Sequence, residues 1–536
     1  MLLAAGFFFV LHYWHLRADF PNNSPWSDWS KYTDEGWYGD AAIRHFQLGH
    51  WYVPGDFNAA AALPVWPVVE GLLFRITGVS ISAARALTVT IFGGILLASY
   101  LLIRRWRPRA NGEPTRQNLS PALAILLLAA SPFCFVFTRL AILEPMLVLL
   151  TLLALHAATS APRALERTGF VQRWLPTVLL GLLLPLMILT KTTGLFLMPA
   201  VAFLLWSSAG RHMRPFLRTA IPAGAIGLLA WSAYFLLVVR PHYLVDYRYL
   251  FSANAYTGIT LGTALSVLWD TFTSGIWIGR LLYPLAVVTV VVALVRVRTL
   301  RSQPLIPTLI LWPLGYAAFL AYHDNLQPRY YLVIAVPLTL LVAVVLEPAW
   351  HMLRPVFHST HSTPARPMLA LATMAALAIL VVTDARQTIE YVRNPEFTLV
   401  DAARSLAQVV RSHPTQSPLV LSISGSNLSL MTGLPSICDD FGTLDLAKRV
   451  EQYKPGWYAA WNDLEDDKMD ALARFYNPVR VATFPAMDDP DRNVLILYRL
   501  DPRQPNEPRP KRTRKPIPRS LQTKLGQQPS VQQLEH

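Results

Sequence analysis

Acidic and aromatic side chains gather in one segment near the N-terminus. Asp34, Glu35, Tyr38 and Asp40 all fall within residues 32–40. An aspartate that caps a following helix would explain Asp34 alone, but not the adjacent pair together with Asp40. Carboxylates can take up and release a proton during a reaction. We therefore predict that Asp34 and Glu35 are catalytic and that Tyr38 and Asp40 line the same pocket.

Two short segments further along the chain carry a second set of charges. Glu144 follows Arg139 closely, and Lys191 is followed by two threonines and Gly194. An ammonium beside hydroxyl groups can hold a phosphate, although a lysine that merely reaches for the membrane surface has the same appearance in a sequence. We predict that Glu144 is a further catalytic acid and that Arg139 and Lys191 bind a phosphate.

The segment 322–331 supplies another cation. A guanidinium can contact a phosphate through two parallel hydrogen bonds, so Arg329 is our third candidate for phosphate binding. His323 and Tyr330 are further candidates for the same pocket. A single histidine at a helix end is more often structural than catalytic, and that alternative stays open for His323.

The composition of the chain indicates which class of protein holds these residues in place. The chain has 536 residues, of which 53% are hydrophobic and 15% charged, with a net charge of +14. These proportions exclude a disordered or collagen-like chain, and a mean hydropathy of +0.34 favours a polytopic membrane protein. The basic residues lie largely in loops between apolar runs, so we expect no nucleic-acid partner. Cys134 and Cys438 cannot form a disulfide framework, and we predict that both are free.

Apolar runs long enough to cross a bilayer predict an α-helical polytopic membrane protein with about eleven transmembrane helices. Residues 64–79 are apolar too, but the run is short and holds two prolines, a glutamate and an arginine. We expect an interfacial or re-entrant helix there, within the first outer loop. The predicted spans are 1–17, 80–103, 119–137, 140–158, 174–190, 192–208, 219–239, 278–295, 304–322, 330–350 and 368–383.

The basic residues are distributed unevenly between the two sets of loops. The loops on one side hold 16 Lys and Arg in 65 residues, against 8 in 110 on the other side. Because basic loops stay in the cytoplasm, the N-terminus is predicted to be cytoplasmic. All the candidate site residues then lie on the outer face. The compact loops suggest a bacterial inner membrane, with the site facing the periplasm.

The rest of the chain differs in composition from the transmembrane domain, residues 1–383. Residues 384–500 alternate short β-like runs with helical patterns and predict a small α/β domain with a partly parallel sheet on the outer face. Residues 501–536 are basic and rich in Pro and Gln, which predicts a disordered tail that is solvated or touches anionic membrane lipids. The strands are expected at 419–424, 456–461, 479–484 and 493–498, and the helices at 401–412, 443–453 and 463–476.

Taken together, these motifs resemble those of the GT-C superfamily of membrane glycosyltransferases that use polyprenyl-phosphate sugars. The relatives in question are protein O-mannosyltransferases and lipid A aminoarabinose transferases. The resemblance is carried by Asp34-Glu35 in the first outer loop, by Arg139 with Glu144, by Lys191 with its glycine, and by Arg329 before an apolar run. It covers residues 1 to about 350. Glu144 stands where an aspartate is common, and 384–500 does not look like the β-trefoil of the protein mannosyltransferases.

The resemblance implies a reaction and a role for each residue. Asp34 would act as the general base, Glu35 and Glu144 would shape the acceptor site, and Lys191, Arg139 and Arg329 would hold the donor phosphate. The reaction would be one inverting displacement at the anomeric carbon. The donor would be a polyprenyl-phosphate sugar and the acceptor a lipid, a glycan or a protein. No cofactor is required, although the carboxylates could bind a divalent cation.

Three other functions remain open. A flippase or transporter of lipid-linked glycans would need polar residues deep within spans, and often internal repeats. An enzyme of the O-antigen-ligase type would place its key residues in one large outer loop. A non-enzymatic membrane scaffold for the α/β domain would leave the acidic pair and the lysine unexplained. We therefore predict an enzyme, a glycosyltransferase.

Overall fold

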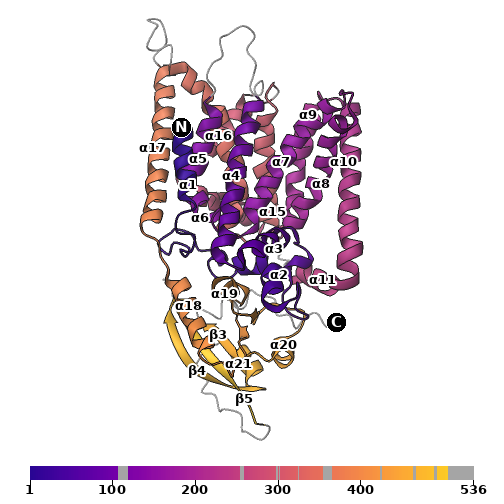
Figure 1. Ribbon diagram of the computed structural model, residues 1–536. Helices are drawn as coiled ribbons and strands as arrows, with labels where there is room; N and C mark the ends of the chain where they lie inside the picture. The colour runs from indigo at the N-terminus through magenta and orange to yellow at the C-terminus, as the bar shows by residue number, and fades with distance from the viewer. Residues whose placement is uncertain are drawn as a thin grey trace.

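The computed structural model describes the helical bundle and the sheet domain. The described residues are 1–106, 119–253, 259–296, 300, 302–323, 325–353, 365–422, 425–462, 466–487 and 492–504. Helices α1 to α17 form a bundle, and the strands lie beyond one end of it (Figure 1). The predicted basic tail falls almost entirely outside the described residues.

Within the described residues, seven helical segments are long and apolar enough to cross a membrane, or eight if one bent pair counts as a single span. The bent pair is Ala264–Ile278 with Leu282–Val295, and the helix direction changes by 118° between the two parts. The chain is thus a multi-pass integral membrane protein. The seven are α4 (Ile81–Arg105), α7 (Leu143–Ala164), α8 (Phe170–Thr190), Met213–Ser252, α15 (Leu305–His323), Pro328–Glu347 and Leu371–Arg411.

Three of the eleven predicted spans form helices that are too short to count by length. Segment 1–17 gives α1 (Leu2–Leu11), and segment 192–208 gives η3 (Thr192–Leu197) followed by α9 (Met198–Ser208). A helix of ten residues is about 15 Å long, half the hydrocarbon thickness. Segment 119–137 breaks at Ser131, which is extended and whose hydroxyl caps a new helix that begins with proline. Its two parts are α5 (Ser120–Ala130) and α6 (Pro132–Phe137).

The segment 213–253 contains an irregularity. It runs as α10 (Met213–Tyr234), η4 (Phe235–Tyr243) and α11 (Leu244–Ala253), and η4 is a π-helix with a proline inside it. The π-helix connects α10 to α11 without a break, and α11 lies at the end of the bundle nearer the sheet domain (Figure 1).

The first outer loop forms helices at the end of the bundle nearest the sheet (Figure 1). The helices α2 (Asp34–Leu48) and α3 (Val65–Thr77) lie there. The short turn η1 (Trp29–Lys31) precedes α2, and the short turn η2 (Ala59–Ala61) lies between α2 and α3. At thirteen residues, α3 is about 20 Å long. It is too short to span, as predicted for 64–79. Trp66, Glu70 and Phe74 recur every four residues on its buried face.

The remaining helices include the bent pair and the helices that form the last two candidate spans. They are α12 (Ala264–Thr273), η5 (Ser274–Ile278), α13 (Leu282–Val295), η6 (Pro328–Tyr331), α16 (Leu332–Leu353) and α17 (Ala365–Arg393). Helix α17 runs from the far end of the bundle to the sheet domain (Figure 1).

The C-terminal part holds a mixed sheet of five strands in the order β2-β1-β3-β5-β4. Strand β1 is parallel to β2 and β3, whereas β5 is antiparallel to β3 and β4. A partly parallel sheet was predicted. Strand β1 lies in a predicted run of strand-forming residues, 419–424, whereas β2 was missed because Ser436–Ile437 belongs to no such run. The strands are β1 (Val420–Leu421), β2 (Ser436–Ile437), β3 (Trp457–Trp461), β4 (Tyr476–Pro485) and β5 (Val494–Pro502); the helices are α18 (Thr398–Arg411), α19 (Gly425–Thr432), α20 (Leu446–Tyr453) and α21 (Asp466–Leu472).

The sheet domain packs directly against the first outer loop. Helix α19 lies against α2, and the two backbones meet at Gly36. A Cβ atom on this glycine would lie 2.0 Å from the backbone nitrogen of Asn427, closer than any side chain allows. Tyr32 joins the same apolar core as Trp457 and Leu497 of the sheet. The loop that carries the predicted acids is therefore held between the bundle and the sheet.

Candidate active site

Asp34 and Glu35 are the first two residues of α2, and both are buried. Consecutive residues on a helix point about 100° apart, so the two carboxylates face different neighbours. Asp34 turns toward η6, where its Oδ2 lies 2.8 Å from Nη2 of Arg329. Its Oδ1 accepts a hydrogen bond from the hydroxyl of Thr33 at 3.1 Å.

Arg329 is held from a second side by a carboxylate that the sequence analysis did not single out. Asp28 is fully buried, and its Oδ1 lies 2.6 Å from Nη1 of Arg329. The backbone N–H of Arg329 donates to the other oxygen of Asp28 at 2.9 Å. Asp28 also accepts from the backbone N–H of Ser30, which makes it the cap of η1. An acid six residues before Asp34, between two tryptophans of the same loop, was the available signal.

Lys191 and Glu144 form a second buried pair close by. The Lys191 ammonium donates a hydrogen bond to Oε1 of Glu144. It also lies 4.0 Å from the centre of the Tyr330 ring, while the Arg329 guanidinium carbon lies 4.7 Å from the same ring centre. Both cations thus face one aromatic ring. We call the resulting set the Arg329 cluster: Asp28, Asp34, Glu144, Lys191, Arg329 and Tyr330.

Burial changes the acidity of the groups at the start of α2. Removal from water raises the pKa of Asp34 to about 6, and the carboxylates of Asp28 and Glu144 add to this effect, whereas Arg329 opposes it. Burial and the Asp34 carboxylate also raise the pKa of Tyr38, which is four residues further along the same helix face. Asp34 can therefore accept a proton near neutral pH, while Tyr38 stays protonated as a hydrogen-bond donor.

Two predicted site residues have partners outside this cluster. Glu35 forms a two-pronged ion pair with Arg85 of α4, at 2.7 and 2.6 Å, and accepts from the backbone N–H of Ala141 at 2.9 Å. Arg139 donates to the backbone carbonyls of Trp14 at 2.7 Å and His15 at 2.6 Å. Glu35 thus joins α2 to α4 and to the turn before α7, whereas Arg139 joins that turn to the residues that follow α1. The structure does not bring either residue beside Lys191.

Asp40 and His323 also lie apart from the Arg329 cluster. The ring of His323 stacks on that of Phe319 at the end of α15, with 5.2 Å between ring centres. Asp40 pairs with Arg44 at 2.7 Å and accepts a hydrogen bond from Ser426 of the sheet domain. It belongs to what we call the Asp56 cluster: Asp40, Arg44, Asp56 and Arg449.

No metal site is apparent in the part of the chain that the structure describes, where no group of three or more ligating side chains converges. Asp34, Glu35 and Glu144 each face a different cation, namely Arg329, Arg85 and Lys191. The divalent cation that the sequence left open stays a prediction to be tested.

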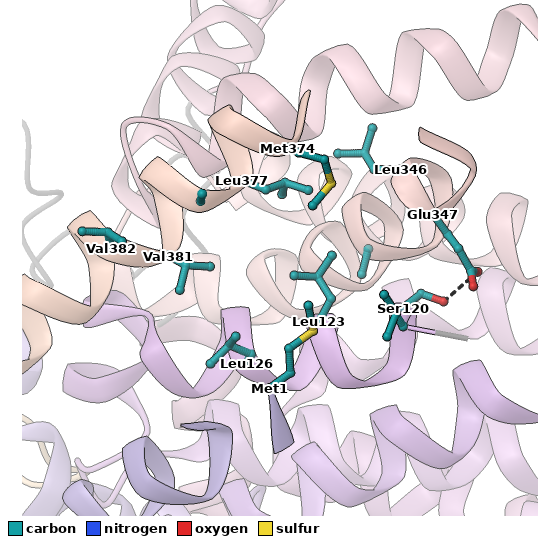
Figure 2. A pocket seen from close by; sticks show the side chains of 13 residues that line it. Met1, Ser120, Leu123, Leu126, Leu346, Glu347, Met374, Leu377, Val381 and Val382 are labelled. Carbon is teal, nitrogen blue, oxygen red and sulfur yellow. Dashed lines mark hydrogen bonds between the residues drawn. The ribbon is translucent and has the colours of Figure 1, made fainter. Parts of the chain in front are cut away.

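A cavity of about 290 Å³ lies at the other end of the bundle (Figure 2). Leu123, Leu126, Met374 and Leu377 point into it, and the hydroxyl of Ser120 donates to Glu347 at its edge, at 2.9 Å. Its apolar lining and its position separate it from the Arg329 cluster, so the two cannot form one site.

The comparisons with known proteins give the same fold. No protein-family model and no curated protein matches the sequence. The solved structure of ArnT from Cupriavidus metallidurans in the apo state matches with a TM-score of 0.58 and 15% identity, over 92% of this chain and 97% of that one. Its form bound to undecaprenyl phosphate matches with a TM-score of 0.56 and 14% identity over the same shares.

A third structure belongs to another kind of enzyme. The archaeal oligosaccharyltransferase AglB from Archaeoglobus fulgidus, in complex with an inhibitory peptide and a dolichol-phosphate, matches with a TM-score of 0.50 and 14% identity. The match covers 95% of this chain and 74% of that one. The resemblance predicted from the sequence is thus confirmed at the level of architecture, and the chain has the fold of the GT-C membrane glycosyltransferases.

Proposed function

We propose that this protein is an inverting glycosyltransferase that moves a sugar from a polyprenyl-phosphate donor to a lipid, glycan or protein acceptor. The observation that carries the proposal is the Arg329 cluster. It places a carboxylate of raised pKa, Asp34, on one arginine, with a lysine across the Tyr330 ring. The related folds support the donor class, since solved ArnT binds undecaprenyl phosphate and solved AglB binds a dolichol-phosphate.

The proposed reaction is one displacement at the anomeric carbon. Asp34 removes the proton from the attacking group of the acceptor, and that group forms the new glycosidic bond. The bond from the anomeric carbon to the phosphate oxygen breaks with inversion, and polyprenyl phosphate leaves with the bonding electrons. Lys191 and Arg329 stabilise the negative charge that grows on the leaving phosphate. No cofactor enters this scheme.

Burial of the cations makes them effective phosphate ligands. The side chains of Lys191 and Arg329 are 10% and 6% exposed, and charged groups interact more strongly where water is scarce. The donor phosphate would exchange places with carboxylate contacts, because both cations are already paired. Lys191 is the better placed to exchange, since Glu144 accepts its one hydrogen bond within the described residues.

We also propose an orientation in a bacterial inner membrane. Helix α2, which begins with Asp34, lies at the same end of the bundle as the sheet domain, and the N-terminus, whose Met1 lines the apolar cavity, lies toward the opposite end (Figure 1). The last turns of α4 and α7, away from the sheet domain, carry Arg104, Arg105 and Arg163. Because basic residues favour the cytoplasmic side, the active site and the sheet domain would face the periplasm.

The experiment that tests this function uses purified protein in lipid nanodiscs with a panel of radiolabelled polyprenyl-phosphate sugars. We expect release of sugar from one donor, to water or to a co-purified acceptor. Asp34→Asn should lower that rate about 10²- to 10⁴-fold, the usual contribution of a general base. Glu166→Gln, an exposed carboxylate at the other end of α7, is the matched control and should keep the wild-type rate.

Two outcomes would count against the proposal. Full activity of Asp34→Asn would remove Asp34 from the reaction. Movement of an intact donor across the membrane with no sugar released would identify a flippase instead of a transferase.

A further inference from the structure

A second cavity, of about 240 Å³, lies where the transmembrane bundle meets the sheet domain. One wall is the start of α4, and the others come from α18 and from the end of α19. It shares no lining residue with the Arg329 cluster. The lining residues that matter here are Arg17, Ser80, Ile81, Arg404, Thr432 and Gly433.

The cavity is rich in positive charge that the protein neutralises only in part. Arg17 donates from Nε to the hydroxyl of Ser82 at 3.2 Å, and it has no acidic partner among the described residues. Arg404 pairs with Asp401 at 3.3 Å, but both side chains are about half exposed or more, and such pairs hold weakly. Arg411 adds a third guanidinium beside the cavity, where it donates to the carbonyl of Thr432 at 2.5 Å.

The start of α4 adds to the same field. Ser80, the residue before this helix of 25 residues, is extended, and its side chain makes no capping hydrogen bond. The first N–H groups of a long helix carry partial positive charge and favour an anion. Ser80 and Ile81 line the cavity, so this helix end faces the same space as the two arginines.

The start of α4 indicates the depth of the cavity in the membrane. At 25 residues this helix is about 38 Å long, so its two ends fall near the lipid headgroups if it crosses the bilayer. Ser80 and Ile81 at the start of α4 line the cavity, and Arg17 donates to Ser82 in the first turn of the helix. We therefore infer that the Arg17 guanidinium lies at the level of the lipid phosphates.

We propose that this cavity binds the phosphodiester headgroup of an anionic phospholipid. Guanidinium groups grip phosphate oxygens through paired, charge-assisted hydrogen bonds. A lipid bound there would contact α4 of the bundle together with α18 and α19 of the sheet domain, and would therefore join the two parts. A free phosphate offers the same oxygens, but it lacks acyl chains that partition into the bilayer next to α1 and α4.

Lipid retention measured by native mass spectrometry tests the proposal on the full chain. Wild-type protein is equilibrated with phosphatidylglycerol, with phosphatidylcholine, and with inorganic phosphate, each in turn. We expect retained phosphatidylglycerol to exceed phosphatidylcholine about tenfold, the ratio that corresponds to one good charged contact. Arg17→Ala with Arg404→Ala should abolish this preference. Arg75→Ala with Arg474→Ala removes the same charge from exposed arginines outside the cavity and should keep the preference.

The remaining arms separate the alternatives. Arg17→Lys with Arg404→Lys keeps the charge without the planar fork, and should retain phosphatidylglycerol at an intermediate level. This variant decides the matter if the alanine pair fails to fold. Equal retention by wild type and both cavity variants would overturn the proposal. Arginine-dependent binding of inorganic phosphate that matches phosphatidylglycerol would overturn the lipid as the ligand and leave a free-phosphate site.

Discussion

Helix α2 contributes to two buried charge clusters, and the carboxylates of the two clusters differ in how many of their oxygens accept hydrogen bonds. In the Asp56 cluster, Asp56 accepts from Arg44 at 2.5 Å, from Arg449 at 2.8 Å and from the backbone N–H of Cys438 at 3.1 Å. Arg449 donates in addition to three backbone carbonyls. Both oxygens of Asp56 therefore have donors within the protein.

The Arg329 cluster leaves capacity unused. An ammonium has three N–H donors, yet Lys191 donates to Glu144 alone among the described residues. The second oxygen of Glu144 is buried without a hydrogen-bond partner in the same part of the chain. Buried polar groups normally find partners, so the unpartnered oxygen of Glu144 and the unused donors of Lys191 are open to the contacts of a ligand. The two clusters thus differ at their carboxylates, since both oxygens of Asp56 accept hydrogen bonds whereas one oxygen of Glu144 accepts none among the described residues.

The largest expected effect concerns the Asp56 cluster, in which both oxygens of the central carboxylate accept hydrogen bonds. Asp56→Asn should lower the free energy of unfolding by about 3–5 kcal/mol, because two buried arginines lose their shared anion. The measurement is thermal unfolding in nanodiscs, followed by near-ultraviolet circular dichroism. Asp34→Asn should change that transition far less. A small shift for Asp56→Asn, equal to that of Asp34→Asn, would show that the number of hydrogen bonds to the carboxylate does not distinguish the clusters.

The next effect concerns the cation with unused donors. Lys191→Met should lower the sugar-transfer rate about 100-fold, the scale of one lost transition-state donor. The variant also leaves Glu144 buried and unpaired, so Lys191→Met with Glu144→Gln should recover stability without recovering activity. Arg139→Gln is the comparison, because Arg139 contacts backbone carbonyls and not the cluster. A loss for Arg139→Gln as large as for Lys191→Met would place Arg139 in the donor site after all.

The pH dependence should be of intermediate size. The pKa of Asp34 is raised to about 6 by burial, and the base must be ionised to accept a proton. The rate should therefore level off above pH 7 and fall about tenfold for each pH unit below 6. Assays of initial rate between pH 4.5 and 8.5 measure this profile. A rate that stays constant down to pH 5 would rule out a base with this pKa.

The smallest expected effect is that of chelation. Each of the three predicted acids faces its own cation. We therefore expect EDTA to leave the transfer rate within about twofold of the untreated enzyme, a change no larger than the loss of one weak ion pair would cause. Activity assayed with EDTA, and again after adding Mg²⁺ or Mn²⁺, gives the answer. A large loss that either metal restores would show that the carboxylates rearrange around a cation.

Sequence reasoning brought out every member of the Arg329 cluster except Asp28. Glu144, Lys191 and Arg329 stood out as charges beside apolar runs, Asp34 stood out as half of an acidic pair, and the structure places them together. Asp28 was missed because it has no acidic neighbour in the sequence and its role appears only through its contact with Arg329. The partners of Arg139 are backbone carbonyls, which leave no trace in a sequence.

The same contrast holds for the fold. Long apolar runs such as α4 and α7 were predicted from hydropathy. A segment that crosses the hydrocarbon must be apolar and must pair its backbone groups within one helix, and both requirements are visible in the sequence. Segment 119–137 was wrong as a single span because Ser131 ends one helix and caps the next. The sheet domain was foreseen from strand patterns, but β2 pairs over only two residues and carries no such pattern.

The contact between α2 and the sheet domain also determines when the proposed active site can form during synthesis. Asp40 and its partner Ser426 are separated by 386 residues, and Asp56 and Arg449 by 393. At ordinary rates of translation, about 20 to 80 seconds pass between the two ends of such a contact. During that time the acids of α2 are uncovered in the new chain. A ribosome that stops before α19 therefore leaves a membrane-inserted protein in which α2 lacks its contacts with the sheet domain.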